Sequence, residues 1–143
     1  MTVIALPPEW RKMDASDADG VDYIACGPVT SQGYAPTLLI TRVRDAEPSS
    51  IEKGMERILG NAHVDPTCRV LDVGDATVGG KPALVAALTM CAEGRNVTEL
   101  MYCVGTEEGR EAYILVFMAV SSDFARQIRA VADIVADFEP EEV

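Results

Sequence analysis

The sequence predicts an α+β domain in which a central, mostly antiparallel sheet of about six to seven strands carries two amphipathic helices, one on each face. Glycine-containing turns at Gly79-Gly80, Glu93-Gly94 and 107–109 separate strand-like runs, and such short connections favour antiparallel neighbours. Two segments show apolar residues at helical spacing. The strands carry apolar side chains on both faces, so both faces must be covered. The expected order is β-β-β-α-β-β-β-β-α.

Three strands are expected before the first helix. A short, weak strand spans 9–13 around the single tryptophan, and a second strand spans 21–26. The segment 14–20 between them is rich in aspartate and other small residues, which favours a loop. The third strand spans 37–44, where β-forming residues alternate between two faces.

The first helix is expected to begin at Ser49, because Ser49 and Glu52 have the spacing of a capping box. Gly60-Asn61 marks its expected end. Its apolar stripe consists of Ile51, Met55, Ile58, Leu59 and Ala62. The second helix follows an N-terminal signal at 121–123. Its stripe consists of Phe124, Ile128, Val131, Val135 and Phe138.

Between the two helices, residues 69–120 are expected to form a meander of four antiparallel strands. One helix on each face is the favoured arrangement, because it covers both faces of the sheet within one chain. In the alternative arrangement, both helices share one face and a second subunit covers the other. The sequence pattern is compatible with both.

The composition restricts the choice of partners. The 143 residues suit a single domain spanning 1–143, with an acidic, frayed tail at 139–143. A net charge of −11, with no cluster of basic residues, argues against binding to nucleic acid or to an anionic membrane surface. No apolar run approaches the roughly 20 residues of a membrane helix, and no secretory leader is visible. We therefore expect an acidic, cytoplasmic protein.

The sequence shows no recognisable set of catalytic residues. His63 is the only histidine, and Ser–His or Cys–His catalysis would depend on it. It lies near Asp65 and Cys68, but an exposed or capping histidine at a helix end is the favoured interpretation. The four cysteines have no zinc-site spacing and are interpreted as small buried hydrophobic residues: Cys26, Cys68, Cys91 and Cys103. We expect neither a cofactor nor a metal ion.

Two loop motifs resemble known sites only in part. In the acidic segment 14–20, Asp17 and Asp19 fall at calcium-ligand positions, but Ala15 and Cys26 stand where the first and last oxygen ligands are required. In the segment 74–82, Pro82 stands where a phosphate-binding loop requires serine or threonine. We interpret the first as a solvated loop and the second as a hairpin turn.

Three features remain open. Glu99 shares a strand face with apolar residues, so it is either a functional acid or a residue near a strand end that reaches solvent. Met90, Met101 and Met118, with Tyr102, Tyr113 and Phe117 nearby, form either an adaptable groove or, as we favour, part of the core. Trp10 is either a plug at the end of the sheet, the favoured interpretation, or a partner-binding anchor.

Three short motifs follow one another along the chain: the segment 6–10, the hairpin Val78–Ala83, and 112–116 followed by Phe124. They resemble the opening signature, the central hairpin and the ending of the PsbP-like superfamily, whose members include the photosystem II extrinsic protein P, a Ran-binding import factor and Lpq-type lipoproteins. The resemblance implies an α/β/α sandwich that binds other proteins and shares no catalytic motif. Glu9 stands where the family usually has glycine, and the absence of a leader or lipid-bearing cysteine argues against an envelope role.

The leading hypothesis is a non-enzymatic protein-binding or accessory module whose partner is another protein. One alternative is a small-molecule binding protein or minor enzyme with a pocket at the sheet edge near Trp10. The other is a structural homodimer.

Overall fold

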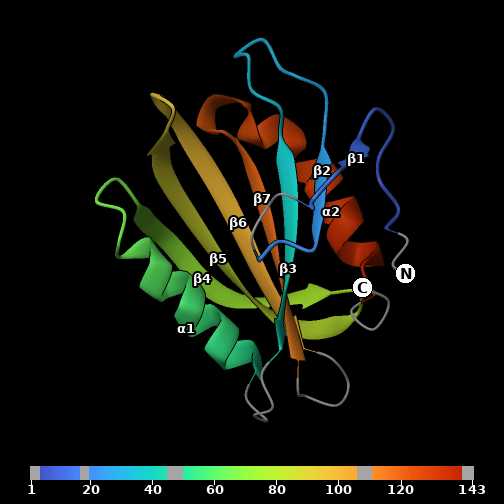
Figure 1. Cartoon of the computed structure of the whole chain (residues 1–143), viewed down its shortest axis with the longest axis vertical. Helices are drawn as coiled ribbons and strands as arrows, with labels where there is room; N and C mark the ends of the chain where they lie inside the picture. Colours follow the sequence, from blue (N-terminus) through green and yellow to red (C-terminus); the bar gives the residue numbers. More distant parts are fainter. Residues whose placement is uncertain (1–3, 17–19, 45–49, 106–110, 140–143) are drawn as a thin grey trace.

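The computed structural model describes residues 4–16, 20–44, 50–105 and 111–139. Seven strands form one antiparallel sheet in the order β1-β2-β3-β7-β6-β5-β4, as Figure 1 shows. The predicted fold class and element order are confirmed. The elements are β1 (Arg11–Met13), β2 (Tyr23–Cys26), β3 (Thr37–Arg44), α1 (Ser50–Ala62), β4 (Arg69–Val78), β5 (Lys81–Ala92), β6 (Arg95–Gly105), β7 (Glu111–Val120) and α2 (Phe124–Asp137), with a 3₁₀ turn at Ser121–Asp123.

The meander β4-β5-β6-β7 is held by tight turns. Both central residues of the β4–β5 turn have positive φ, 58° at Gly79 and 78° at Gly80. The same holds in the β5–β6 turn, with 53° at Glu93 and 76° at Gly94. Two consecutive positive φ angles define a type I′ turn, whose twist matches that of antiparallel strands. The third predicted turn, at 107–109, lies outside the described residues.

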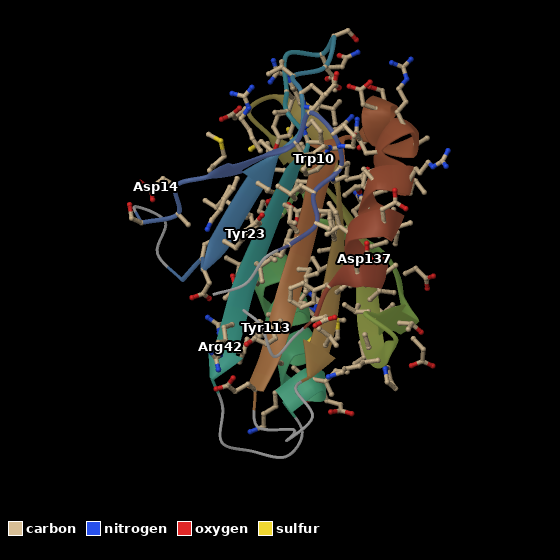
Figure 2. All side chains as sticks on the ribbon, turned by 90° about the vertical axis from the view of Figure 1, so that its right-hand side faces the viewer. Trp10, Asp14, Tyr23, Arg42, Tyr113 and Asp137 are labelled. Atoms are coloured by element: carbon tan, nitrogen blue, oxygen red, sulfur yellow. The ribbon has the colours of Figure 1, made fainter. Side chains whose placement is uncertain are left out.

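The pairing of β3 with β7 joins the N-terminal strands to the meander, and no local sequence pattern predicts it. Thr37–Arg44 pairs with 111–118 over its whole length. Arg42 forms an ion pair with Glu111, and its guanidinium carbon lies 5.7 Å from the centre of the Tyr113 ring. Figure 2 shows Arg42 and Tyr113 together at the lower end of these strands. These contacts join residues that are about 70 positions apart in the chain.

The helices cover opposite faces of the sheet, so the alternative arrangement with both on one face is wrong. Figure 1 shows α1 and α2 on opposite sides. The core under α1, here called the α1-side core, consists of Met55, Ile58, Ala86, Leu88, Cys103, Ala112 and Ile114. The larger core under α2, here called the α2-side core, includes Leu38, Ile40, Tyr113, Leu115, Phe117, Ile134 and Phe138.

The approach of α1 to the sheet depends on Gly54. A Cβ atom at that position would lie 2.4 Å from the sulfur of Cys103, closer than any real contact. The Cys103 thiol donates a hydrogen bond to the main-chain oxygen of Ile51 over 3.2 Å. Burial raises the pKa of Cys103 to about 12, so this thiol is a packing element rather than a nucleophile.

The cysteines are not all buried as predicted. Cys103 is buried, Cys26 and Cys68 are half-buried, and Cys91 is exposed. All four are free thiols. The prediction is wrong for Cys91 because it lies near the end of β5, beyond the part of that strand covered by either core.

The helix ends differ in detail from the prediction. Ser49 of the predicted capping box lies outside the described residues, and α1 continues to Ala62, past the predicted stop. Before α2, Asp123 makes no side-chain capping hydrogen bond, because a 3₁₀ turn places it in a helical conformation. Asp123 is buried, and among the described residues its Oδ2 atom has no hydrogen-bond partner. The predicted start of the second helix at 121–123 is therefore correct in position, but no side chain there caps α2.

The turn before β1 concerns Glu9, which stands where the resembling signature has glycine. The N–H of Trp10 donates to the oxygen of Pro7 over 3.2 Å, and Glu9 has a φ of 74°. A proline at the second position and a positive φ at the third define a type II turn, which favours glycine at the third position. Glu9 therefore occupies a conformation that disfavours a side chain.

We expect Glu9→Gly to stabilise the fold by about 0.5 to 1 kcal/mol, since the left-handed conformation costs about 1 to 2 kcal/mol for a residue with a Cβ atom and glycine loses more entropy on folding. Urea unfolding measures the gain. Glu9→Ala, which also removes the charge but keeps the Cβ atom, is the control and should bring no comparable gain. Equal stabilities of the two variants would contradict the strain at this position.

Candidate functional site

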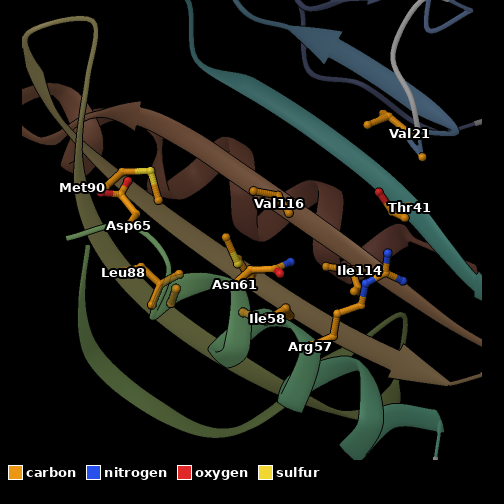
Figure 3. Close-up of a pocket in the computed structure, with 13 residues that line it drawn as sticks. Val21, Thr41, Arg57, Ile58, Asn61, Asp65, Leu88, Met90, Ile114 and Val116 are labelled. Atoms are coloured by element: carbon orange, nitrogen blue, oxygen red, sulfur yellow. The ribbon is translucent and has the colours of Figure 1, made fainter. Parts of the chain in front are cut away.

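A cavity of about 290 Å³ lies on the α1 side of the sheet, between α1 and strands β3, β5, β6 and β7. Figure 3 shows the side chains that surround it. The floor is mainly apolar, and the rim carries polar groups. The floor residues are Ile58, Leu88, Met90, Met101, Ile114 and Val116, and the polar side chains are Thr41, Arg57, Asn61 and Asp65.

The sheet register shows that the cavity is elongated along the strands. Thr41 pairs with Ile114, and that row continues through Cys103 to Leu84 of β5. Met90 lies six residues further along β5, a distance of about 20 Å at the usual rise of a strand. Thr41 and Met90 therefore mark opposite ends of the cavity.

The two charged groups of the cavity point toward these ends, but they lie closer together than Thr41 and Met90 do, since Arg57 and Asp65 are only eight residues apart in and just after α1. In Figure 3, Arg57 lies on the side of Thr41, and Asp65 lies beside Met90. Arg57 is exposed, and no ion pair joins it to any residue that the structure describes. Asp65 follows the end of α1 and is half-buried. The cavity thus has a cationic end and an anionic end with an apolar floor between them.

The Asp65 carboxylate is held by its own loop. Its Oδ1 atom accepts hydrogen bonds from the main-chain N–H of Thr67 over 2.8 Å and from the Thr67 hydroxyl over 2.7 Å. These hydrogen bonds lower the pKa of Asp65, so the group is an anion at neutral pH. Its Oδ2 atom has no hydrogen-bond partner within the described ranges.

Glu99 lies in the middle of β6 next to the cavity, since it pairs with the lining residue Leu88. Its side chain is only 5% exposed, so the interpretation as a solvent-reaching acid near a strand end is wrong. Burial, and then the negative charge of Asp65, raise the pKa of Glu99 to about 7. The same surroundings raise the pKa of the Cys68 thiol, through burial and through the charges of Asp65 and Glu99.

The β4 edge of the sheet is a second candidate site. β4 is the last strand in the sheet order, and within the described residues it pairs with β5 alone. Three of its large apolar side chains are exposed: Val70 by 42%, Leu71 by 61% and Val73 by 43%. The register shifts between Val70 and Asp72, so Leu71 is the extra residue of a bulge. The set Val70, Leu71 and Val73 is called the β4 edge patch below.

The other predicted site residues carry no binding geometry. His63 is exposed just after α1, and its main-chain N–H donates to the oxygen of Leu59 over 3.3 Å, as expected for a residue at a helix end. Asp17 and Asp19 lie outside the described residues. In the part of the chain that the structure describes, no three His, Cys, Asp or Glu side chains are grouped closely enough to hold a metal ion. None of the described helices is long and apolar enough to cross a membrane.

The predicted methionine and aromatic set is split between the two faces of the sheet. Met90 and Met101 line the cavity. Met101 also packs against the α1-side core, as the favoured interpretation has it, whereas Met90 belongs to neither core cluster. Tyr102 and Phe117 contact each other edge to face on the α2 side, with ring centres 6.1 Å apart. The alternation of side chains along each strand is the sequence signal that could have separated the methionines on the α1 side from the aromatic residues on the α2 side.

Trp10 lies on the α2 side, half-buried against the α2-side core (Figure 2). A Cβ atom at Gly27 would lie 2.7 Å from its ring, so a glycine is needed beneath it. The hollow beside Trp10 has a volume of only about 10 Å³, which is at most the room of a single water molecule. That hollow is too small for a ligand, and the predicted pocket at the sheet edge near Trp10 stays a prediction. The role of Trp10 as a partner-binding anchor stays a prediction.

Comparisons of the whole structure identify solved proteins of the same fold. No family model and no curated protein sequence matches the chain. LpqN of Mycobacterium tuberculosis, involved in cell envelope biogenesis, has a TM-score of 0.67 at 18% identity, covering 93% of this chain and 79% of LpqN. Cyanobacterial PsbP of Synechocystis has a TM-score of 0.67 at 9% identity, covering 95% and 84%.

The Saccharomyces cerevisiae Ran-binding protein Mog1p has a TM-score of 0.58 at 10% identity, covering 95% of this chain and 88% of Mog1p. At these identities the comparisons establish the fold. The predicted resemblance to PsbP-like proteins is thereby confirmed: the chain has the fold shared by PsbP, Mog1p and LpqN.

Proposed function

We propose that the protein is a non-enzymatic accessory module that binds another protein along the free edge of β4. The observation that carries this proposal is the β4 edge patch. Exposed apolar side chains on an edge strand, next to unpaired main-chain groups, form a surface to which an extended segment of a partner adds as a further strand.

The charge of this edge indicates the chemistry of the partner. Asp72 and Asp75 are exposed on β4, and the whole chain has a net charge of −11. Antiparallel pairing of two copies through β4 would place two strands that each carry these aspartates side by side, and like charges directly opposite each other destabilise such pairs. A basic, extended segment of a different protein fits the edge better than a second copy does.

Two further observations support a binding role. In Figure 3, Arg57 and Asp65 point toward different ends of the cavity rather than toward one another, an orientation that suits two ends of a bound ligand more than one reacting bond. The fold is shared with the Ran-binding protein Mog1p.

The test compares partner capture by three proteins. We expect Leu71→Lys to abolish capture of a partner by strand addition, because an edge lysine blocks pairing and repels a basic segment. Ile128→Lys, at an exposed apolar residue of α2, is the matched control and should capture the partner as the wild type does. Hydrogen exchange of the wild-type complex should show new protection in β4.

Two results would contradict the proposal. One is equal loss of the captured protein in both lysine variants, which would assign the binding to general surface hydrophobicity. The other is a stable dimer in light scattering of the wild type that Leu71→Lys converts to a monomer, which would make β4 an interface between two copies.

A further inference from the structure

The α1-side cavity is a separate site from the β4 edge, since none of its lining residues comes from β4. Its volume of about 290 Å³ corresponds to roughly ten water molecules at about 30 Å³ each, which is room for a small molecule. Met90 and Met101 give the floor flexible, polarisable side chains that adapt to apolar ligands. The cavity therefore provides an apolar binding surface with charged ends.

The Arg57 end suits a carboxylate. In a strongly acidic chain, Arg57 is a cation without an ion-pair partner among the described residues, at the rim of an apolar cavity. Its planar guanidinium offers paired donors whose geometry matches the two oxygens of a carboxylate. The Thr41 side chain lines the same end and can add a hydroxyl donor.

The Asp65 end suits an ammonium group. The two hydrogen bonds from Thr67 fix the carboxylate through Oδ1 and keep it ionised. The remaining oxygen, Oδ2, can accept a hydrogen bond from a cationic donor. The anion is thus already oriented before a ligand arrives, which lowers the entropic cost of binding.

We propose that this cavity binds a small zwitterionic amphiphile whose carboxylate lies at Arg57, whose ammonium group lies at Asp65 and whose apolar segment lies on the floor between them. The charged groups of the ligand must be well separated, because Arg57 and Asp65 are eight residues apart in and just after α1, about 12 Å at the usual rise of a helix. An ω-amino carboxylate with an apolar spacer has this form. A molecule with adjacent charges reaches only one end.

The test uses four small probes and the methyl signals of the methionines. We expect 8-aminooctanoate to shift the Met90 and Met101 methyl signals in a saturable way and to leave that of Met13, on exposed β1, unchanged. It should bind roughly tenfold more tightly than octanoate or octylamine, each of which lacks one charge. The shorter 4-aminobutanoate should show no such advantage.

Two variants assign the charges. Arg57→Gln should weaken binding of octanoate and 8-aminooctanoate roughly tenfold and leave octylamine unaffected. Asp65→Asn, which keeps an acceptor for Thr67, should weaken octylamine and 8-aminooctanoate and leave octanoate unaffected. Arg129→Gln, at an exposed arginine of α2 on the far face, is the control for net charge and should change none of these affinities.

Three results would overturn the proposal: equal affinities for the three eight-carbon probes, binding that neither cavity variant weakens, or no saturable shift of either cavity methionine. Because these measurements do not involve β4, their failure leaves the proposed docking edge untouched. Loss of partner capture in Leu71→Lys likewise leaves the cavity proposal untouched.

Discussion

Replacing Gly79 with alanine is expected to destabilise the protein by about 3 to 5 kcal/mol, much more than the same change at the neighbouring Gly80. A Cβ atom at Gly79 would lie 1.8 Å from the main-chain oxygen of Phe138. Main-chain atoms cannot turn aside as a flexible side chain can, so either the β4–β5 turn or the end of α2 must move.

That movement affects several interactions together. The N–H of Gly79 donates to the oxygen of Val135 over 2.8 Å, and this hydrogen bond ties the turn to the last turn of α2. The ring of Phe138 is buried in the α2-side core, where it lies 5.9 Å from the ring of Tyr113. Displacing Phe138 therefore adds repacking of the core to the loss of the hydrogen bond.

Gly80→Ala is the matched control, because Gly80 also has a positive φ but a Cβ atom there would meet nothing within 4 Å. It should cost about 1 kcal/mol, the strain of a left-handed alanine. Urea unfolding of both variants measures the difference. Equal losses would mean that the contact between the turn and the end of α2 contributes nothing to stability.

The same position shows how far the sequence predicts the fold. Gly79-Gly80 predicts a tight turn because consecutive glycines allow positive φ, and the turn is found there. The contact of that turn with the end of α2 joins residues almost 60 positions apart, so no local pattern reports it. The pairing of β3 with β7 could not be predicted from the sequence for the same reason. Alternation and spacing predict elements and faces, but they do not predict which distant elements meet.

The candidate site was harder to predict than the fold. Glu99 was identifiable as a carboxylate on an apolar strand face. The cavity itself depends on how α1 lies across the sheet, since Arg57 becomes a lining residue only through that placement. On the sequence, Arg57 is an ordinary polar residue of an amphipathic helix. The single tryptophan made Trp10 the residue from which a pocket was predicted. The cavity of about 290 Å³ lies on the other face of the sheet, under α1.

The second large effect is expected at Glu99. We expect Glu99→Gln to stabilise the protein by roughly 2 to 3 kcal/mol more at pH 8 than at pH 5. The unfolded chain loses the Glu99 proton near the ordinary pKa of 4.5, whereas the folded protein holds it up to a pKa of about 7. Between these values unfolding releases a proton, so wild-type stability falls as the pH rises through this window. The loss is complete above about pH 7, and glutamine, which does not titrate, avoids it.

Urea unfolding of wild type and variant at a series of pH values between 5 and 8 measures this difference. Glu56→Gln, at an exposed glutamate of α1, is the matched control for the loss of a carboxylate and should change stability little. A stability difference between Glu99→Gln and the wild type that stays constant across the series would contradict the raised pKa.

The groups around Glu99 connect this prediction to the cavity. Burial is the larger cause of the raised pKa, and the charge of Asp65 is the second. Asp65→Asn should therefore narrow the pH window by lowering the pKa of Glu99, without removing the effect of burial. An ammonium group bound at Asp65 would neutralise the same charge, so 8-aminooctanoate should lower the pKa of Glu99 in the wild type and leave it unchanged in Asp65→Asn. Titration of the Glu99 side-chain carboxyl carbon by NMR, with and without the probe, measures this directly.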